Sequence, residues 1–167
     1  MKTRKLVFTA IFIACSFIGA NLRIAGTIAF DSMPAFLGAV ILGPLYGGII
    51  AAFGHFLTAL TLGFPLSIPV HTITMFSMGL AVYLYGKVGQ IFEARTNKWI
   101  ARLVAIVIAI VFNGPVALLL VTPIVGLSVW AMLPVLCIVA AANVLLSEVI
   151  YGCLPAVVKK QYEGLKQ

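Results

Sequence analysis

Long uncharged apolar stretches alternate with short polar segments along this chain. Residues 32–86 hold 55 consecutive positions without a charge, and residues 103–147 hold 45. As a straight helix the first stretch would be about 80 Å long, whereas the hydrocarbon core of a bilayer is ~30 Å thick. The first stretch is therefore predicted to cross a membrane more than once, and the second is long enough for two crossings. Apolar and polar residues do not alternate as they would in a membrane barrel, which favours helices.

Proline and glycine residues divide these stretches into spans. Pro34 can open a helix, because proline is tolerated in the first turn. The run Gly43-Pro44-Leu45-Tyr46-Gly47-Gly48 predicts a tight turn, and Asn21 to Met33 reads as an outer loop. The predicted fold class is all-α, a single six-helix transmembrane domain over residues 1–167. The expected spans cover residues 6–20, Pro34 to the turn at Gly43, that turn to Leu62, 70–86, 100–121 and 131–154.

The positive charges predict the orientation. Lysine and arginine cluster at the N-terminus, within residues 87–102 and at the C-terminus, and Arg23 alone lies elsewhere. Cytoplasmic loops carry the lysine and arginine excess of membrane proteins. Both termini and the middle cluster are therefore expected in the cytoplasm, which requires an even number of spans on each side of the middle cluster.

Composition supports a membrane protein. Hydrophobic residues make up 63% of the chain, charged residues 9%, and the mean hydropathy is +1.18. A water-soluble domain of this size cannot bury so much apolar surface, so a soluble enzyme and a disordered chain are excluded. The net charge of +7 is then explained by the membrane rather than by nucleic acid, and no nucleic-acid partner is expected.

Polar side chains within the predicted spans are candidates for a site, because polar groups are costly at membrane depth. His55 lies midway along the third span, and His71 opens the fourth on a helical face shared with Met75. Asn113 and Asn143 lie midway along the fifth and sixth spans. Each also has a structural interpretation: a packing hydrogen bond to a neighbouring helix for His55, core packing for the His71 face, and repair of the proline kink for Asn113. For Asn143 the structural and functional interpretations are equally open.

The outer loop offers further candidates beside the entrance to the second span. Phe30, Asp31 and Phe36 combine a charge with aromatic rings that can pack on a flat ligand, and Trp130, just before the sixth span, can also pack on a ring. Ser32 is expected to cap the helix that begins at Met33 or Pro34. The predicted substrate-binding residues are Phe30, Asp31, Phe36, His55, His71, Met75, Asn113, Trp130 and Asn143.

Motifs for catalysis, metal binding or ATP hydrolysis are missing from the sequence. There is no phosphate-binding loop and no metalloprotease or serine-hydrolase motif, and no cofactor is expected. The cysteines Cys15, Cys137 and Cys153 read as small buried hydrophobic residues rather than metal ligands. Glu148 and Arg102 are expected at similar depth, where a structural ion pair is favoured over a proton-coupling carboxylate.

Several stretches resemble a known family. They are Ala10-Ile11-Phe12-Ile13-Ala14, the segment from Phe30-Asp31-Ser32-Met33-Pro34 to Gly43-Pro44-Leu45-Tyr46-Gly47-Gly48, and Gly54-His55 followed by Gly63 to His71. Together with six short spans they resemble the substrate-binding S components of energy-coupling factor (ECF) vitamin transporters. The second and third stretches look most like the branch proposed to take up α-ribazole, a cobalamin precursor.

The resemblance implies a division of labour. The chain would capture a vitamin-like molecule from outside, in a bacterial plasma membrane, without being an enzyme. It would dock through the small residues Ala10 and Ala14 on a transmembrane T component, while two ATPase subunits supply energy. The alternatives are an S component for another vitamin such as cobalamin, pantothenate or pyridoxine, a ligand-free membrane assembly subunit, and a membrane enzyme.

Overall fold

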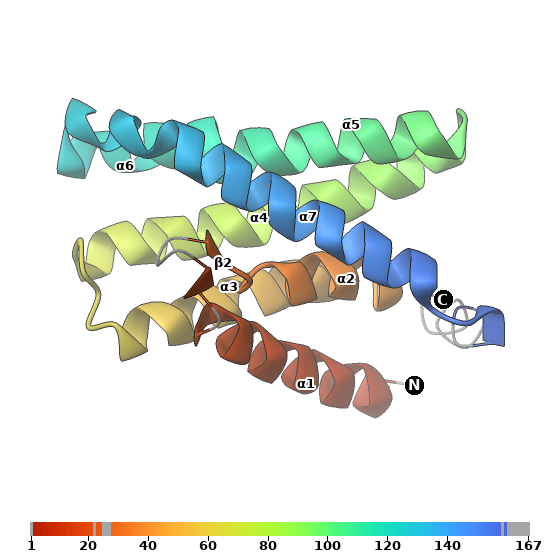
Figure 1. Cartoon of the computed structure of the whole chain (residues 1–167). Helices are drawn as coiled ribbons and strands as arrows, with labels where there is room; N and C mark the ends of the chain where they lie inside the picture. The colour runs from red at the N-terminus through yellow and green to blue at the C-terminus, as the bar shows by residue number, and fades with distance from the viewer. Residues whose placement is uncertain (1, 22, 25–27, 158, 160–167) are drawn as a thin grey trace.

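Helices running back and forth along one axis make up nearly all of the protein. The computed structural model describes residues 2–21, 23–24, 28–157 and 159. The elements in chain order are α1 (Lys2–Asn21), β1 (Arg23–Ile24), β2 (Ile28–Ala29), α2 (Met33–Ile41), α3 (Pro44–Thr61), α4 (Ile68–Glu93), α5 (Lys98–Val111), η1 (Phe112–Val116), α6 (Ala117–Val125), η2 (Leu127–Met132) and α7 (Leu133–Cys153). The marked N- and C-termini lie at the same end of the bundle (Figure 1). We call this the terminal end, and the end that carries the 62–67 turn the distal end.

Local sequence explains where these helices begin. Proline occupies the first turn of α2, α3, α4 and α7, where its missing N–H has no helical partner to lose. Asn97 caps α5 by accepting a hydrogen bond from the backbone N–H of Trp99 at 2.9 Å. Ser32 precedes α2 as expected, but it contributes its backbone carbonyl to the first turn and its side chain makes no capping bond.

The helix α2 lies at the centre of the bundle. It contacts α1, α3, α4 and α7, and seven of its nine residues are buried. A helix that is apolar on every side is expected to be buried on every side. The fully buried side chains of Phe36 on α2, Ile50 on α3, Val82 on α4 and Val144 on α7 meet around it.

Glycine permits the closest helix contacts. A Cβ on Gly48 of α3 would lie 2.8 Å from the backbone oxygen of Gly79 on α4. A Cβ on Gly47 would lie 2.6 Å from the Cα of Ala39 on α2. Small residues at such crossings let membrane helices approach closely.

The span count differs from the prediction. Among the described residues, five helical stretches are long and apolar enough to cross a membrane: Thr3–Asn21, Pro44–Thr61, Ile68–Glu93, Lys98–Val125 and Leu127–Cys153. Helices occur at the positions of all six predicted spans, in the expected order, but α2 has nine residues and is only about 13 Å long. A helix of this length would span about half of the hydrocarbon core. The chain shortly before it forms the strand Ile28–Ala29 rather than further helical turns.

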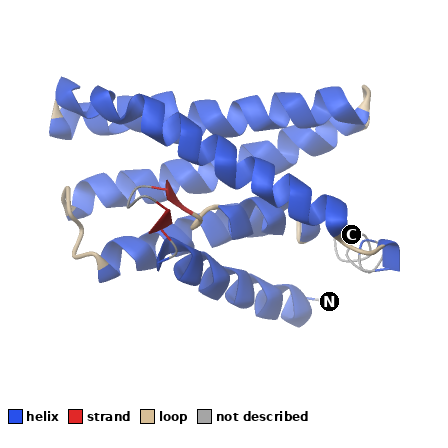
Figure 2. Ribbon diagram, in the orientation of Figure 1, coloured by secondary structure: helices blue, strands red, loops and turns tan. Residues whose placement is uncertain are grey.

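That extended chain contains strands that the all-α prediction did not include. β1 and β2 pair antiparallel, with Arg23 opposite Ala29 (Figure 2). The backbone N–H of Phe30 donates to the carbonyl of Gly19 on α1 at 3.2 Å. A Cβ on Gly19 would lie 2.9 Å from the carbonyl carbon of Phe30, so glycine is needed for this approach.

Two further boundaries differ in ways that affect the site. The fourth helix continues to Glu93 rather than ending at Gly86, as a polar extension beyond the apolar stretch. The fifth span runs through a π-helical turn at Phe112–Val116 that contains Pro115. The wider turn accommodates the proline, which has no backbone N–H to donate.

Candidate functional site

A cavity of about 300 Å³ lies between α3, α4, η1, α6, η2 and α7, and its lining includes Leu66 of the 62–67 turn at the distal end. Its size is at the lower end of the range for small-molecule sites. Its wall is mostly apolar, with a few polar residues. The lining residues are Asp31, Ser32, His55, Leu66, Val70, His71, Thr74, Met78, Asn113, Ala117, Leu118, Val121, Val129, Met132, Val135, Leu136, Val139 and Ala140.

The two histidines of the chain meet at this cavity. His55 on α3 and His71 on α4 are brought together by the short connection between these antiparallel helices. Nδ1 of His71 lies 3.3 Å from Nε2 of His55, and the rings stack with centroids 5.4 Å apart. The Phe64 ring packs edge-on against His71 at 5.8 Å, so the His71 ring is held from two sides.

Two side-chain nitrogens at the cavity have no hydrogen-bond partner. Nε2 of His71 and Nδ2 of Asn113 are buried, and neither has a partner among the described residues. Buried polar groups are nearly always paired, so an unpaired one calls for an explanation. Both belong to residues that line the same cavity, so both nitrogens are available for a hydrogen bond there.

Asn113 therefore does not repair the proline kink through this nitrogen. Its side chain lies on the π-helical turn, where the widened backbone already accommodates Pro115. The kink instead places Asn113 on the cavity wall.

The structure brings four of the nine predicted substrate-binding residues to the cavity: Asp31, His55, His71 and Asn113. The other five do not belong to its lining. Phe36 is fully buried against the Tyr85 ring, with centroids 5.1 Å apart, and is part of the central core. Phe30 lies beside α1 through its backbone bond to Gly19, and Met75 is half-buried on α4.

Asn143 and Trp130 hold the wall of the cavity. The Asn143 side chain is completely buried, and its Oδ1 accepts the backbone N–H of Met33 at 2.9 Å while its Nδ2 donates to the Val139 carbonyl at 3.0 Å. Nε1 of Trp130 donates to Oγ1 of Thr122 at 3.0 Å. The Trp130 ring packs against the cluster that contains Val121 and Val129.

Sequence reasoning missed the apolar wall. Leu118 and Val121 on α6, Val129 on η2 and Val139 on α7 line the cavity, but in the sequence they look like any lipid-facing residue of a span. The two breaks Pro115 and Gly126 were the available signal, because they set the course of α6 beside α7.

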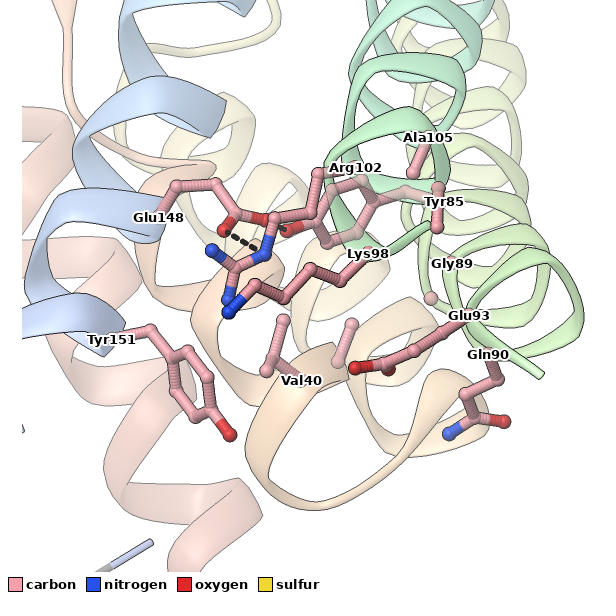
Figure 3. Close-up of a pocket in the computed structure, with 13 residues that line it drawn as sticks. Val40, Tyr85, Gly89, Gln90, Glu93, Lys98, Arg102, Ala105, Glu148 and Tyr151 are labelled. Atoms are coloured by element: carbon pink, nitrogen blue, oxygen red, sulfur yellow. Dashed lines mark hydrogen bonds and ion pairs between the residues drawn. The ribbon is translucent and has the colours of Figure 1, made fainter. Parts of the chain in front are cut away.

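A second, smaller pocket of about 140 Å³ lies at the terminal end, among α2, α4, α5 and α7 (Figure 3). Here Nε of Arg102 lies 3.4 Å from Oε2 of Glu148, which confirms the predicted structural ion pair. The Tyr85 hydroxyl donates to the other carboxylate oxygen of Glu148. This network joins α4, α5 and α7, and we call it the terminal clamp.

Comparison with family models identifies the chain. The model for the substrate-specific component of ECF transporters matches residues 4–160. The chain belongs to this family of S components. Neither the comparison with curated proteins nor that with solved structures gives a match.

Family membership confirms the coarser expectations from the sequence. An S component is a membrane-integral transport subunit rather than an enzyme, and it works with a T component and ATPase subunits on a small-molecule substrate in the bacterial plasma membrane. The apolar helices agree with a protein embedded in the bilayer.

Proposed function

We propose that this S component captures a vitamin-like molecule in the distal cavity, and that the molecule is α-ribazole. One observation carries the proposal: unpaired polar nitrogens on His71 and Asn113 belong to a mostly apolar cavity large enough for a small ligand. A flat ring system with a sugar has the matching chemistry, since apolar walls can pack on the rings and polar groups can bind hydroxyls or ring nitrogens.

The proposed orientation places the cavity outside the cell. The basic clusters of the N-terminus and of the α4–α5 junction gather at the terminal end (Figure 1), and such clusters favour the cytoplasm. The distal end, with the cavity, then faces outwards. Asp31, His71 and Asn113 are the proposed direct ligand contacts, and His55 is proposed to take part in binding through its contact with His71. Asn143 and Trp130 support the wall.

Native mass spectrometry of the detergent-purified chain, without added ligand, tests the function. We expect a bound mass that matches α-ribazole. Another vitamin's mass, such as that of cobalamin, pantothenate or pyridoxine, keeps the transport function and contradicts the proposed substrate. If no mass is retained, titration with a panel of these vitamins follows, and a lack of binding to all of them favours the ligand-free assembly subunit.

We also propose that Ala10 and Ala14 form the surface that docks on the T component. Both lie exposed on α1, on a face shared with exposed Val7, Ile11 and Ile18. Their small size allows another helix to approach closely.

A bulky side chain on this face tests the docking. Ala14→Trp should reduce co-purification of the T component at least severalfold while leaving ligand binding unchanged, because the cavity lies elsewhere. Leu119→Trp is the matched control, since Leu119 is 62% exposed on α6, away from α1. Equal co-purification of the Ala14→Trp variant and the control would contradict this docking surface.

A further inference from the structure

We propose that the distal cavity is specific for a ligand without negative charge, held between His71 and Asn113, and that His55 is the positioning residue that fixes the hydrogen-bonding role of His71. The inference rests on the proposed function and deepens it. It concerns which chemical class of vitamin-like molecule the site accepts and how the histidine pair selects it.

The charge of the cavity wall supports the specificity for a ligand without negative charge. Asp31 is the single Asp, Glu, Lys or Arg among the lining residues that the structure describes. A carboxylate or phosphate on the ligand would leave water without meeting a lysine or arginine among the described lining residues. Burying an anion without a partner is far more costly than burying a neutral polar group.

The unpaired nitrogens carry the second part. The Asn113 amide offers donor and acceptor groups of fixed chemistry, whereas His71 Nε2 is a donor or an acceptor according to its tautomer. A neutral ligand with hydroxyls or ring nitrogens can satisfy both residues. Leaving them unpaired costs affinity for any ligand that lacks such groups.

The contact between the histidines links His55 to that choice. Across the 3.3 Å contact one ring nitrogen donates and the other accepts. If Nδ1 of His71 donates to His55, then Nε2 of neutral His71 is an acceptor for the ligand, and if Nδ1 accepts, Nε2 is a donor. His55 therefore sets what the ligand meets at His71, although His71 is the residue whose free nitrogen meets it.

The first test uses matched pairs of probes that differ by one anionic group. We would titrate the purified full-length chain with α-ribazole and α-ribazole 5′-phosphate, with pyridoxine and pyridoxine 5′-phosphate, and with pantothenol and pantothenate. The neutral member of the pair that binds should bind at least 100-fold more tightly. Equal or tighter binding of an anionic member overturns the inference and leaves the transport function standing. Failure of all six probes counts against the proposed function as well.

An Arg23→Gln variant makes the charge test complete. The side chain of Arg23 lies outside the described part of the chain, and Arg23 is the one basic residue apart from the terminal and middle clusters. The variant should keep the preference for the neutral probe. If the wild-type chain binds the phosphorylated probe tightly and Arg23→Gln abolishes this, then Arg23 supplies a cation and the inference is wrong.

The second test reads the tautomer of His71 directly. The chain has two histidines, so selective ¹⁵N-histidine labelling gives signals from His55 and His71 alone. In any His55 variant, His71 is the one labelled residue that remains. His55→Phe keeps a ring for stacking but removes the hydrogen bond, whereas His55→Gln keeps a group that can bond to Nδ1.

We expect His55→Phe to shift the ¹⁵N signals of His71 and to weaken ligand binding about tenfold, the effect of one hydrogen bond. In His55→Gln, the ¹⁵N signals of His71 and the ligand affinity should both lie closer to the wild-type values than in His55→Phe. A His55→Phe variant with wild-type ¹⁵N signals of His71 and wild-type affinity would overturn the positioning role. A loss of affinity without any change in those signals would also overturn it, because packing alone would then explain the loss.

Discussion

Asn143 shows how a buried amide can serve the site without lining the cavity. Its Oδ1 holds the backbone N–H of Met33, in the first turn of α2, and its Nδ2 bonds within α7. Because Met33 follows directly on Asp31 and Ser32, this bond fixes the segment that brings those two residues to the cavity. The Asn143 amide therefore connects α7 to the first turn of α2.

Replacing Asn143 should therefore reduce stability. Asn143→Ala would leave the Met33 N–H without its partner, and we expect a loss of about 1–3 kcal/mol in the free energy of unfolding. Thermal unfolding in detergent measures it. Leu145→Ala is the control on the same helix, since Leu145 is 51% exposed, and its melting temperature should change little. Equal shifts for the two variants would contradict the role given to Asn143.

The sequence identified Asn143 as a candidate site residue, but it did not show which group Asn143 binds. A polar residue midway along a span must be paired, and that much follows from composition. Whether it pairs with a ligand or with backbone depends on a contact 110 positions away at Met33. His55 and His71 were easier to place together, because they lie 16 positions apart across one turn.

At the scale of elements, the crossing of α3 and α4 depends on a pair of glycines. A Cβ on Gly48 would lie 2.8 Å from the backbone oxygen of Gly79, and a Cβ on Gly79 would lie 3.2 Å from that of Gly48. The same two helices carry His55 and His71 further along. Their spacing at the cavity is therefore set partly by this crossing.

Gly48→Ala should push α3 and α4 apart. We expect about 1–3 kcal/mol of destabilisation, the usual effect of overpacking, seen as a lower melting temperature in detergent. Gly152→Ala is the matched control on α7, because a Cβ there meets nothing within 4 Å. Removing a helical glycine at an open site should leave stability unchanged or raise it by about 0.5–1 kcal/mol. A Gly48→Ala variant as stable as this control would contradict the crossing.

The elements also show where prediction from sequence succeeds and fails. Pro34, Pro44 and Gly126 correctly indicated helix ends, because proline and glycine act through local backbone geometry. The length of α2 and the pairing of β1 with β2 could not be predicted in this way. Both depend on the chain before α2 folding back onto Gly19 of α1, which is a tertiary contact.

At the scale of the whole molecule, the terminal clamp joins three helices through one carboxylate. Arg102 is 39% exposed and Glu148 16% exposed, so the pair is only partly shielded from solvent. Tyr85, 2% exposed, depends on Glu148 as a hydrogen-bond partner. A change at Glu148 therefore affects α4 and α5 together.

Variants of Glu148 can separate its two interactions. Glu148→Gln removes the ion pair but keeps an acceptor for the Tyr85 hydroxyl, whereas Glu148→Ala removes both. We expect Glu148→Ala to lower the free energy of unfolding by about 1–3 kcal/mol, and Glu148→Gln to cost about 1 kcal/mol less. Glu93→Gln is the control, because the exposed Glu93 lines the same pocket, and it should stay within about 0.5 kcal/mol of wild type. Equal losses in the two Glu148 variants would show that the Tyr85 bond adds nothing.

The position of the terminal clamp determines which end of the helix bundle is held together by polar interactions. Its ion pair joins α5 to α7 and borders the pocket at the terminal end, away from the residues that line the cavity. Polar interactions therefore connect α4, α5 and α7 at the terminal end. Around the cavity the helices contact one another mainly through apolar side chains. Salt that screens the Arg102–Glu148 pair should therefore loosen the terminal end while leaving the apolar contacts around the cavity unchanged.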